Sequence, residues 1–105
     1  MIRYTTPTLT LTVKDADLTG MRVWVTLSDR FNVVKVTIDN PTTEKSGDDT
    51  IVSVTLTQAQ TALFNAGSEV FAQVNYMTVA GVRMATSINS LTVTDNLIKS
   101  ELSYA

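Results

Sequence analysis

Thr8-Leu9-Thr10-Leu11-Thr12-Val13 alternates polar and apolar side chains without a break, and the stretch MRVWVTL at residues 21–27 repeats the alternation. Successive side chains of a β-strand point to opposite faces, so a period of two predicts strands with one buried face and one wet face. Further segments along the chain follow the same pattern. The sequence therefore predicts an all-β domain.

Seven segments of the chain have the length and pattern of strands. Between the fourth and fifth, Thr57 can cap a short helix that turns Leu63 and Phe64 inward. Such a helical crossover is common between the two sheets of a β-sandwich. We therefore predict one immunoglobulin-like β-sandwich domain over residues 1–105, with a small Greek-key barrel as the alternative. The expected antiparallel strands cover residues 8–14, 21–28, 31–38, 50–56, 69–77, 82 to 87 or 88, and 90–94.

Two further segments carry predictions of their own. Residues 39–49 are polar throughout and include Pro41 and Gly47, so we expect a mobile loop there. The third expected strand should bury Val34 with its other inward residues. Residues 95–105 form either a short C-terminal helix docked on the sandwich or an arm that reaches a neighbouring molecule. Asp95 would cap this helix, whose apolar side would hold Leu97, Ile98 and Leu102.

The bulk composition limits the classes of partner. The 105 residues carry a net charge of −2, and the eight lysines and arginines form no cluster, so we do not expect nucleic acid as a ligand. No apolar run approaches the roughly 18 residues of a spanning helix, and the N-terminus lacks the apolar core of a signal peptide. We expect a soluble product that is made without export and has no membrane partner.

The chain contains neither histidine nor cysteine, which are the commonest side chains of metal and nucleophilic sites. Acidic residues in the loop at 39–49, Glu44, Asp48 and Asp49 among them, could supply oxygen ligands to calcium. Their spacing does not match an EF-hand, and a solvated loop is the favoured interpretation. We predict no enzyme activity, no catalytic residues, no metal and no cofactor.

Trp24 and Phe71 lie on the nominally wet faces of their strands. In the register set by Val23 and Val25, Trp24 points away from the inward face. It either packs under one end of the chain or belongs to an exposed patch with Phe71 and Tyr76 that binds a partner or a sugar. The candidate interaction residues are therefore Trp24, Phe71 and Tyr76, with Leu97, Ile98 and Leu102 of the C-terminal segment.

An ordered set of residues along nearly the whole chain resembles a known family. It includes the opening Ile2-Arg3-Tyr4-Thr5-Thr6-Pro7-Thr8, then Leu56-Thr57-Gln58, Gln73-Val74-Asn75-Tyr76, and Asn96-Leu97 near the end; Phe64, Gly67, Gly81, Arg83, Ala85-Thr86 and Val93 complete it. These residues resemble small virion-associated proteins of tailed bacteriophages and, more distantly, the immunoglobulin-like N-terminal domain of phage baseplate upper proteins. The matched positions are architectural, so no site residues are carried over.

The resemblance implies an attachment, adaptor or decoration module in a virion, made in the cytoplasm of the host bacterium. We therefore expect a non-enzymatic structural or accessory protein of the baseplate, tail or head. Its partners would be other phage virion proteins, with self-association as a further option. The alternative is a carbohydrate-binding or adhesin-type sandwich that recognises a bacterial surface glycan by stacking on exposed aromatic rings.

Overall fold

The alternating segments form eight strands in the computed structural model, which describes residues 1–86 and 88–104. One short helix, α1 (Gln58–Thr61), joins the fifth and sixth strands. The strands are β1 (Thr8–Val13), β2 (Arg22–Ser28), β3 (Val34–Asp39), β4 (Thr42–Ser46), β5 (Asp49–Thr55), β6 (Glu69–Met77), β7 (Arg83–Ala85) and β8 (Asn89–Thr92).

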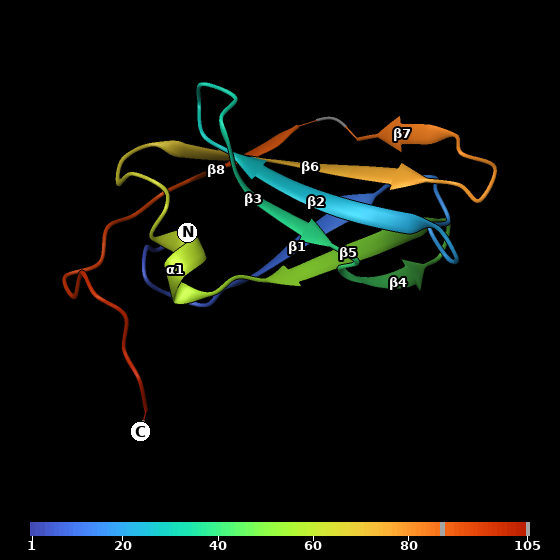
Figure 1. Cartoon of the computed structure of the whole chain (residues 1–105). Helices are drawn as coiled ribbons and strands as arrows, with labels where there is room; N and C mark the ends of the chain where they lie inside the picture. The colour runs from blue at the N-terminus through green and yellow to red at the C-terminus, as the bar shows by residue number, and fades with distance from the viewer. Residues whose placement is uncertain (87, 105) are drawn as a thin grey trace.

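Two antiparallel sheets pack face to face (Figure 1). The smaller sheet has the order β1-β5-β4, and the larger has the order β3-β2-β6-β7, with β8 also pairing with β6. The register of the central pair places Val25 of β2 opposite Val74 of β6 and Leu27 opposite Ala72. These inward side chains are buried, as the alternation predicts. The predicted all-β sandwich is confirmed.

The core between the sheets is built almost entirely from the alternating apolar positions. Val25 and Leu27 of β2 and Val52 of β5 are fully buried. Leu18 is also buried, although the segment that holds it reads as a polar loop. Its backbone N–H donates to the hydroxyl of Thr50, which in turn donates to the carbonyl of Ala16. This pair of bonds fastens the loop over the end of the core.

The predicted mobile loop at 39–49 is wrong, because β4 lies within it. All five residues of β4 are exposed, so the strand has no inward apolar side chain that would produce an alternating pattern. It forms through its pairing with β5 in a hairpin, where Ser46 lies opposite Asp49. Gly47 lies in the turn with φ of 62°, in the left-handed region that glycine adopts without strain.

The prediction that Val34 is buried is also wrong. The register between β2 and β3 shifts at Leu27 and Ser28, and beyond this bulge Val34 lies opposite Ser28. A bulge reverses which side chains point inward, since the side-chain period of a strand is two. Val34 is consequently 55% exposed, whereas Val36, on the regular side of the bulge, is buried.

The helical crossover is present as predicted, but it buries only one of its two expected residues. The Thr57 hydroxyl accepts from the N–H of Gln60, and the Gln60 side chain accepts from the N–H of Thr57, which completes a capping box. Phe64 is 1% exposed and lies in the core, whereas Leu63 is half exposed.

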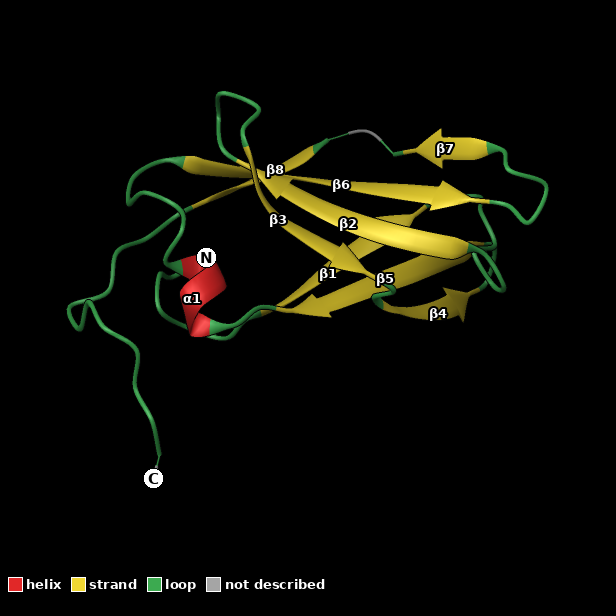
Figure 2. Cartoon of the chain, in the orientation of Figure 1, coloured by secondary structure: helices red, strands yellow, loops and turns green. Residues whose placement is uncertain are grey.

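The predicted C-terminal helix is wrong. Residues 95–104 contain bends and irregular backbone and are drawn as loop in Figure 2. The last two predicted strands are shorter than expected, since β7 ends at Ala85 and β8 at Thr92. Ser87, at one expected end of the sixth predicted strand, lies outside the described residues. Within the described residues, no helix is long and apolar enough to cross a membrane.

Candidate binding surface

The outer face of the larger sheet carries two of the aromatic residues singled out in the sequence. Trp24 of β2 lies opposite Asn75 of β6, and Phe71 of β6 lies opposite Ser28 of β2. Side chains directly opposite each other in antiparallel strands share a face. Trp24 and Phe71 therefore lie toward opposite ends of one surface, and both are only partly exposed.

A shallow hollow of about 340 Å³ lies beside Trp24. On one side of it the Arg83 guanidinium donates to the side-chain amide oxygen of Asn75, with its Nη2 at 3.2 Å from Oδ1. The hollow thus combines an aromatic ring with fixed amide, guanidinium and hydroxyl groups, a mixture suited to a ligand with both apolar and hydroxylated faces. It is lined by Trp24, Thr26, Thr37, Asn75, Met77 and Arg83.

Arg22 covers part of the Trp24 ring. Its guanidinium carbon lies 5.0 Å from the ring centroid, in cation–π range. The same guanidinium donates to the Asp39 carboxylate at 2.8 Å. This hydrogen bond is the largest cause that lowers the pKa of Asp39 below its usual value. The Asp39–Arg22 ion pair therefore lies directly beside the Trp24 ring.

A second hollow, of about 300 Å³, adjoins the first through Thr26, which lines both. Phe71 and Gln73 of β6 line it together with Val34, whose outward position follows from the β2–β3 bulge. The two hollows form one surface over β3, β2 and β6, called the outer face below.

Tyr76 does not belong to the outer face. It lies opposite Val23, on the inward side of β6, and packs against the core while partly exposed. It lines a different hollow near the edge of the sandwich, together with Thr12 and Lys14. The structure therefore separates Tyr76 from the other two aromatic candidates.

The apolar C-terminal candidates lie in an exposed arm, defined here as residues 95–104. Leu97 is fully exposed, and Ile98 and Leu102 are more than half exposed. The arm leaves the end of the sandwich near α1 and runs away from both sheets (Figure 1). Its apolar side chains are displayed to solvent instead of being docked on the sandwich, as the predicted helix would have required.

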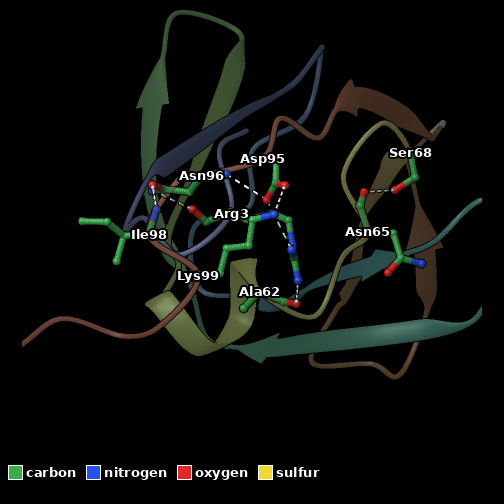
Figure 3. A network of polar contacts seen from close by, with 8 residues as sticks. All are labelled: Arg3, Ala62, Asn65, Ser68, Asp95, Asn96, Ile98 and Lys99. Carbon is green, nitrogen blue, oxygen red and sulfur yellow. Dashed lines mark hydrogen bonds and ion pairs between the residues drawn. The ribbon is translucent and has the colours of Figure 1, made fainter.

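Polar contacts fasten the start of this arm to the N-terminal segment (Figure 3). The Arg3 guanidinium contacts the Asp95 carboxylate at 3.4 Å and donates to the Ala62 carbonyl at 3.1 Å. Lys99 lies 3.1 Å from the same carboxylate. The Asn96 side chain donates to the carbonyl of Arg3. These bonds join three parts of the chain that are distant in sequence.

Of the six residues that line the Trp24 hollow, only Trp24 was among the predicted interaction residues. Asn75 and Met77 follow from the alternation of β6, because they share the face of Phe71. Arg83 depends on the pairing of β7 with β6, where it lies opposite Met77. That pairing register is not encoded in any single segment. Within the described residues, no group of three or more acidic side chains is placed to hold a metal ion.

Comparison with known proteins finds similar solved structures, but no family model and no curated protein sequence matches the chain. Crystal structures of uncharacterized protein lmo2446 from Listeria monocytogenes EGD-e, one of them in complex with glucose, magnesium and calcium, superpose with a TM-score of 0.55 at 18% identity. The same values hold for a cycloalternan-forming enzyme from Listeria monocytogenes in complex with a pentasaccharide substrate.

In each of these matches the aligned region covers 87% of the present chain but only 8% of the Listeria chain. The present chain is thus similar to one small portion of a much larger protein. At 18% identity this likeness concerns the fold: a β-sandwich of this kind also occurs as part of a large polypeptide.

Proposed function

We propose that this protein is a non-enzymatic accessory or structural component of a tailed-phage or prophage particle. It would act through contacts with other virion proteins and with copies of itself, after synthesis in the host cytoplasm. The observation that carries the proposal is the exposed arm, which holds apolar side chains away from a well-packed sandwich. The resemblance of the sequence to virion-associated phage proteins supplies the setting.

The arm supports the presence of a partner because four exposed apolar side chains fall within eight consecutive residues, 97–104. Single exposed apolar side chains are ordinary on protein surfaces, whereas grouped ones mark interaction sites. Leu97, Ile98, Leu102 and Tyr104 all fall in one segment, and each is at least half exposed. Covering them with a partner would remove apolar surface from water, at roughly 25 cal/mol for each Å².

The sandwich also suits an adaptor because its core and its exposed segments are separate. The buried residues come from the strands, α1 and the segments that flank them, and the arm contributes none of them. A partner could therefore bind the arm without disturbing the fold. This separation agrees with a stable module that binds its partners through the arm and not through its core.

Mass spectrometry of purified particles tests the proposal. We expect peptides of this chain in particles of the source phage, or of the induced prophage, after density-gradient purification. A copy lacking residues 97–105 should fold but be depleted from particles, and a Leu63→Ala copy, altered at an exposed residue outside the arm, should be retained. Absence of the polypeptide from intact particles would contradict the proposal.

A second candidate function is recognition of a bacterial surface glycan on the outer face. The Trp24 hollow favours it, because an aromatic ring flanked by hydroxyl, amide and guanidinium groups is a suitable surface for a sugar ring. Two of the Listeria structures are sugar complexes, and the portion of that chain that shares this fold is 8% of its length.

Trp24 is the chain's only tryptophan, so its fluorescence reports directly on this hollow. We expect a saturable change in fluorescence on titration with the correct oligosaccharide. Asn75→Ala should weaken binding, whereas Thr43→Ala, on the other sheet, should not. Unchanged fluorescence together with a glycan array without hits would remove this candidate.

A further inference from the structure

The arm is irregular in the structure, but part of its sequence and one of its contacts are typical of a strand. From residue 98 to residue 104 the even positions hold Ile98, Leu102 and Tyr104, with Ser100 as the one polar residue among them, and the odd positions Lys99, Glu101 and Ser103 are polar. The backbone N–H of Leu102 donates to the Gln58 side chain at 2.7 Å, and its carbonyl accepts from the same amide at 2.8 Å. An amide group that engages both backbone groups of one residue imitates a neighbouring strand.

One sheet edge of the sandwich lacks the usual protection against added strands. Among the described strands, β1 pairs with β5 alone, so its other side is a free edge. Between Thr8 and Val13 there is no charged residue and no proline. Edge strands are normally protected by charges, prolines, bulges or covering segments. The opposite edge of the same sheet, β4, is fully exposed and carries Glu44 and Lys45.

The β1 edge also leaves apolar surface uncovered. Leu9 and Leu11 point into the sandwich and pack against the core, yet both remain partly exposed. Val13, farther along the strand, is buried. A strand added beside β1 with apolar side chains on its inward face would cover both leucines.

The arm of the same molecule does not fill this position. Its course is away from both sheets, and the backbone of Leu102 is bound to Gln58 of α1 (Figure 1). A second molecule can supply its arm without any change in the sandwich. An exchange in which each arm lies on the other's β1 would close a two-fold dimer.

We propose that residues 97–104 of one molecule add as a strand to the β1 edge of a second copy. Ile98, Leu102 and Tyr104 would then lie over Leu9 and Leu11, and main-chain hydrogen bonds would supply much of the affinity. The proposal rests on the self-association that is part of the proposed function, and it identifies the arm and the β1 edge as the two contacting surfaces.

Engineered cysteines test the contact cleanly because the chain contains none of its own. If the apolar face of the arm points inward, Glu101 shares the outward face with Thr8, Thr10 and Thr12. We would mix a Glu101→Cys chain with a Thr8→Cys, Thr10→Cys or Thr12→Cys chain of different mass and oxidise mildly. A mixed disulfide should form with at least one β1 variant, since cross-strand neighbours lie within disulfide range.

The matched control is a Thr42→Cys chain, because Thr42 is exposed, lies opposite Ser53 as Thr10 does, and belongs to the opposite edge of the same sheet. Mixed disulfide well above this control, by about tenfold, supports the proposal. If the yield of mixed disulfide equals that of the control for all three β1 variants, the proposal is overturned. The arm would then bind another virion protein instead of a second copy.

Sedimentation velocity of the full-length chain gives an independent measurement. Leu102→Asp should convert an associated species to monomer, whereas Leu97→Asp, fully exposed on the other face of the arm, should leave it associated. Both sites are exposed, so neither variant should impair folding. A chain that is monomeric at all concentrations, or equal effects of both variants, would overturn the proposal.

These measurements separate the inference from the function on which it rests. If the chain is found in particles but forms no mixed disulfide, the arm exchange is wrong and the virion assignment stands. If the mixed disulfide forms but particles lack the chain, the arm exchange stands and the virion assignment is wrong.

Discussion

The side-chain amide of Gln58 binds both backbone polar groups of Leu102, 44 residues farther along the chain. This contact holds the arm near α1 while leaving the Leu102 side chain exposed. Each such hydrogen bond contributes about 0.5–1.5 kcal/mol net. The contact is therefore weak enough to be exchanged for a better partner, which suits an arm that acts between molecules.

Gln58→Ala should release the arm from α1. In the monomeric Leu102→Asp background, we expect hydrogen exchange of the residue 102 amide to rise by about tenfold, the factor for about 1.4 kcal/mol. Glu101→Ala, a neighbouring change that removes neither bond, should leave that rate unchanged. Equal exchange with and without Gln58 would show that the contact does not hold the arm in solution.

The Asp95 carboxylate should titrate below the usual range. The hydrogen bond from Lys99 is the largest cause that lowers its pKa, followed by the backbone N–H of Asn96; Arg3 makes a smaller contribution. Because the pKa of Asp95 is lower in the folded chain than its ordinary 3.8, the stabilisation that its carboxylate contacts give the arm is fully present above pH 3.8. This stabilisation is lost as the pH falls through the folded-state pKa of Asp95.

A carboxyl ¹³C NMR titration checks this. We expect the Asp95 midpoint below 3.8 in the native chain, and Lys99→Gln should move it upward by more than Arg3→Gln does. A midpoint that Lys99→Gln leaves in place would contradict the assigned cause.

Thr50→Val should destabilise the fold although it keeps the shape of the side chain. The Thr50 hydroxyl is buried, accepts from the Leu18 N–H at 3.1 Å and donates to the Ala16 carbonyl at 2.7 Å. Removing it leaves buried backbone groups unpaired, at a cost of about 1–3 kcal/mol. Urea unfolding at one protein concentration measures the change. The exposed Thr43→Val should stay within about 0.5 kcal/mol, and an equal loss there would contradict the account.

The sandwich could be predicted from sequence because its core positions alternate within single strands. The spacing of Val23, Val25 and Leu27 predicts that they share one buried face, and this needs no knowledge of which strands lie beside β2. β4 could not be predicted in this way, since all its side chains are exposed and only its pairing with β5 makes it a strand. The burial of Val34 was predicted wrongly for a related reason. The bulge that turns Val34 outward is a feature of the β2–β3 pairing, and the sequence of either strand alone does not show it.

The same division applies to the candidate surfaces. Trp24 and Phe71 could be placed on outward faces by alternation, and the β2–β6 register brings them to one face. The helix was one of two interpretations of residues 95–105, because Ile98 and Leu102 are four residues apart and would share one side of a helix. The observed course of the arm depends on contacts made by Gln58, Arg3 and Asn96, and no pattern in the sequence predicts these contacts.

Phe64→Ala and Phe31→Ala should differ sharply in their effect on stability. Phe64 is 1% exposed and packs between the crossover and the core, whereas Phe31 is 69% exposed in the β2–β3 loop. Truncating a buried phenylalanine typically costs about 3–5 kcal/mol, because it removes burial and leaves a cavity. Truncating Phe31 removes chiefly its stacking with Arg30, at 4.7 Å, which contributes about 0.5–1 kcal/mol.

Urea unfolding followed by Trp24 fluorescence measures both variants at one protein concentration, because association also stabilises the folded state. We expect the unfolding midpoint of Phe64→Ala to fall far below that of Phe31→Ala, with similar slopes. Similar losses for the two variants would mean that the β2–β3 loop is packed in solution, and Phe31 would then be covered by a partner or by a second copy of the chain.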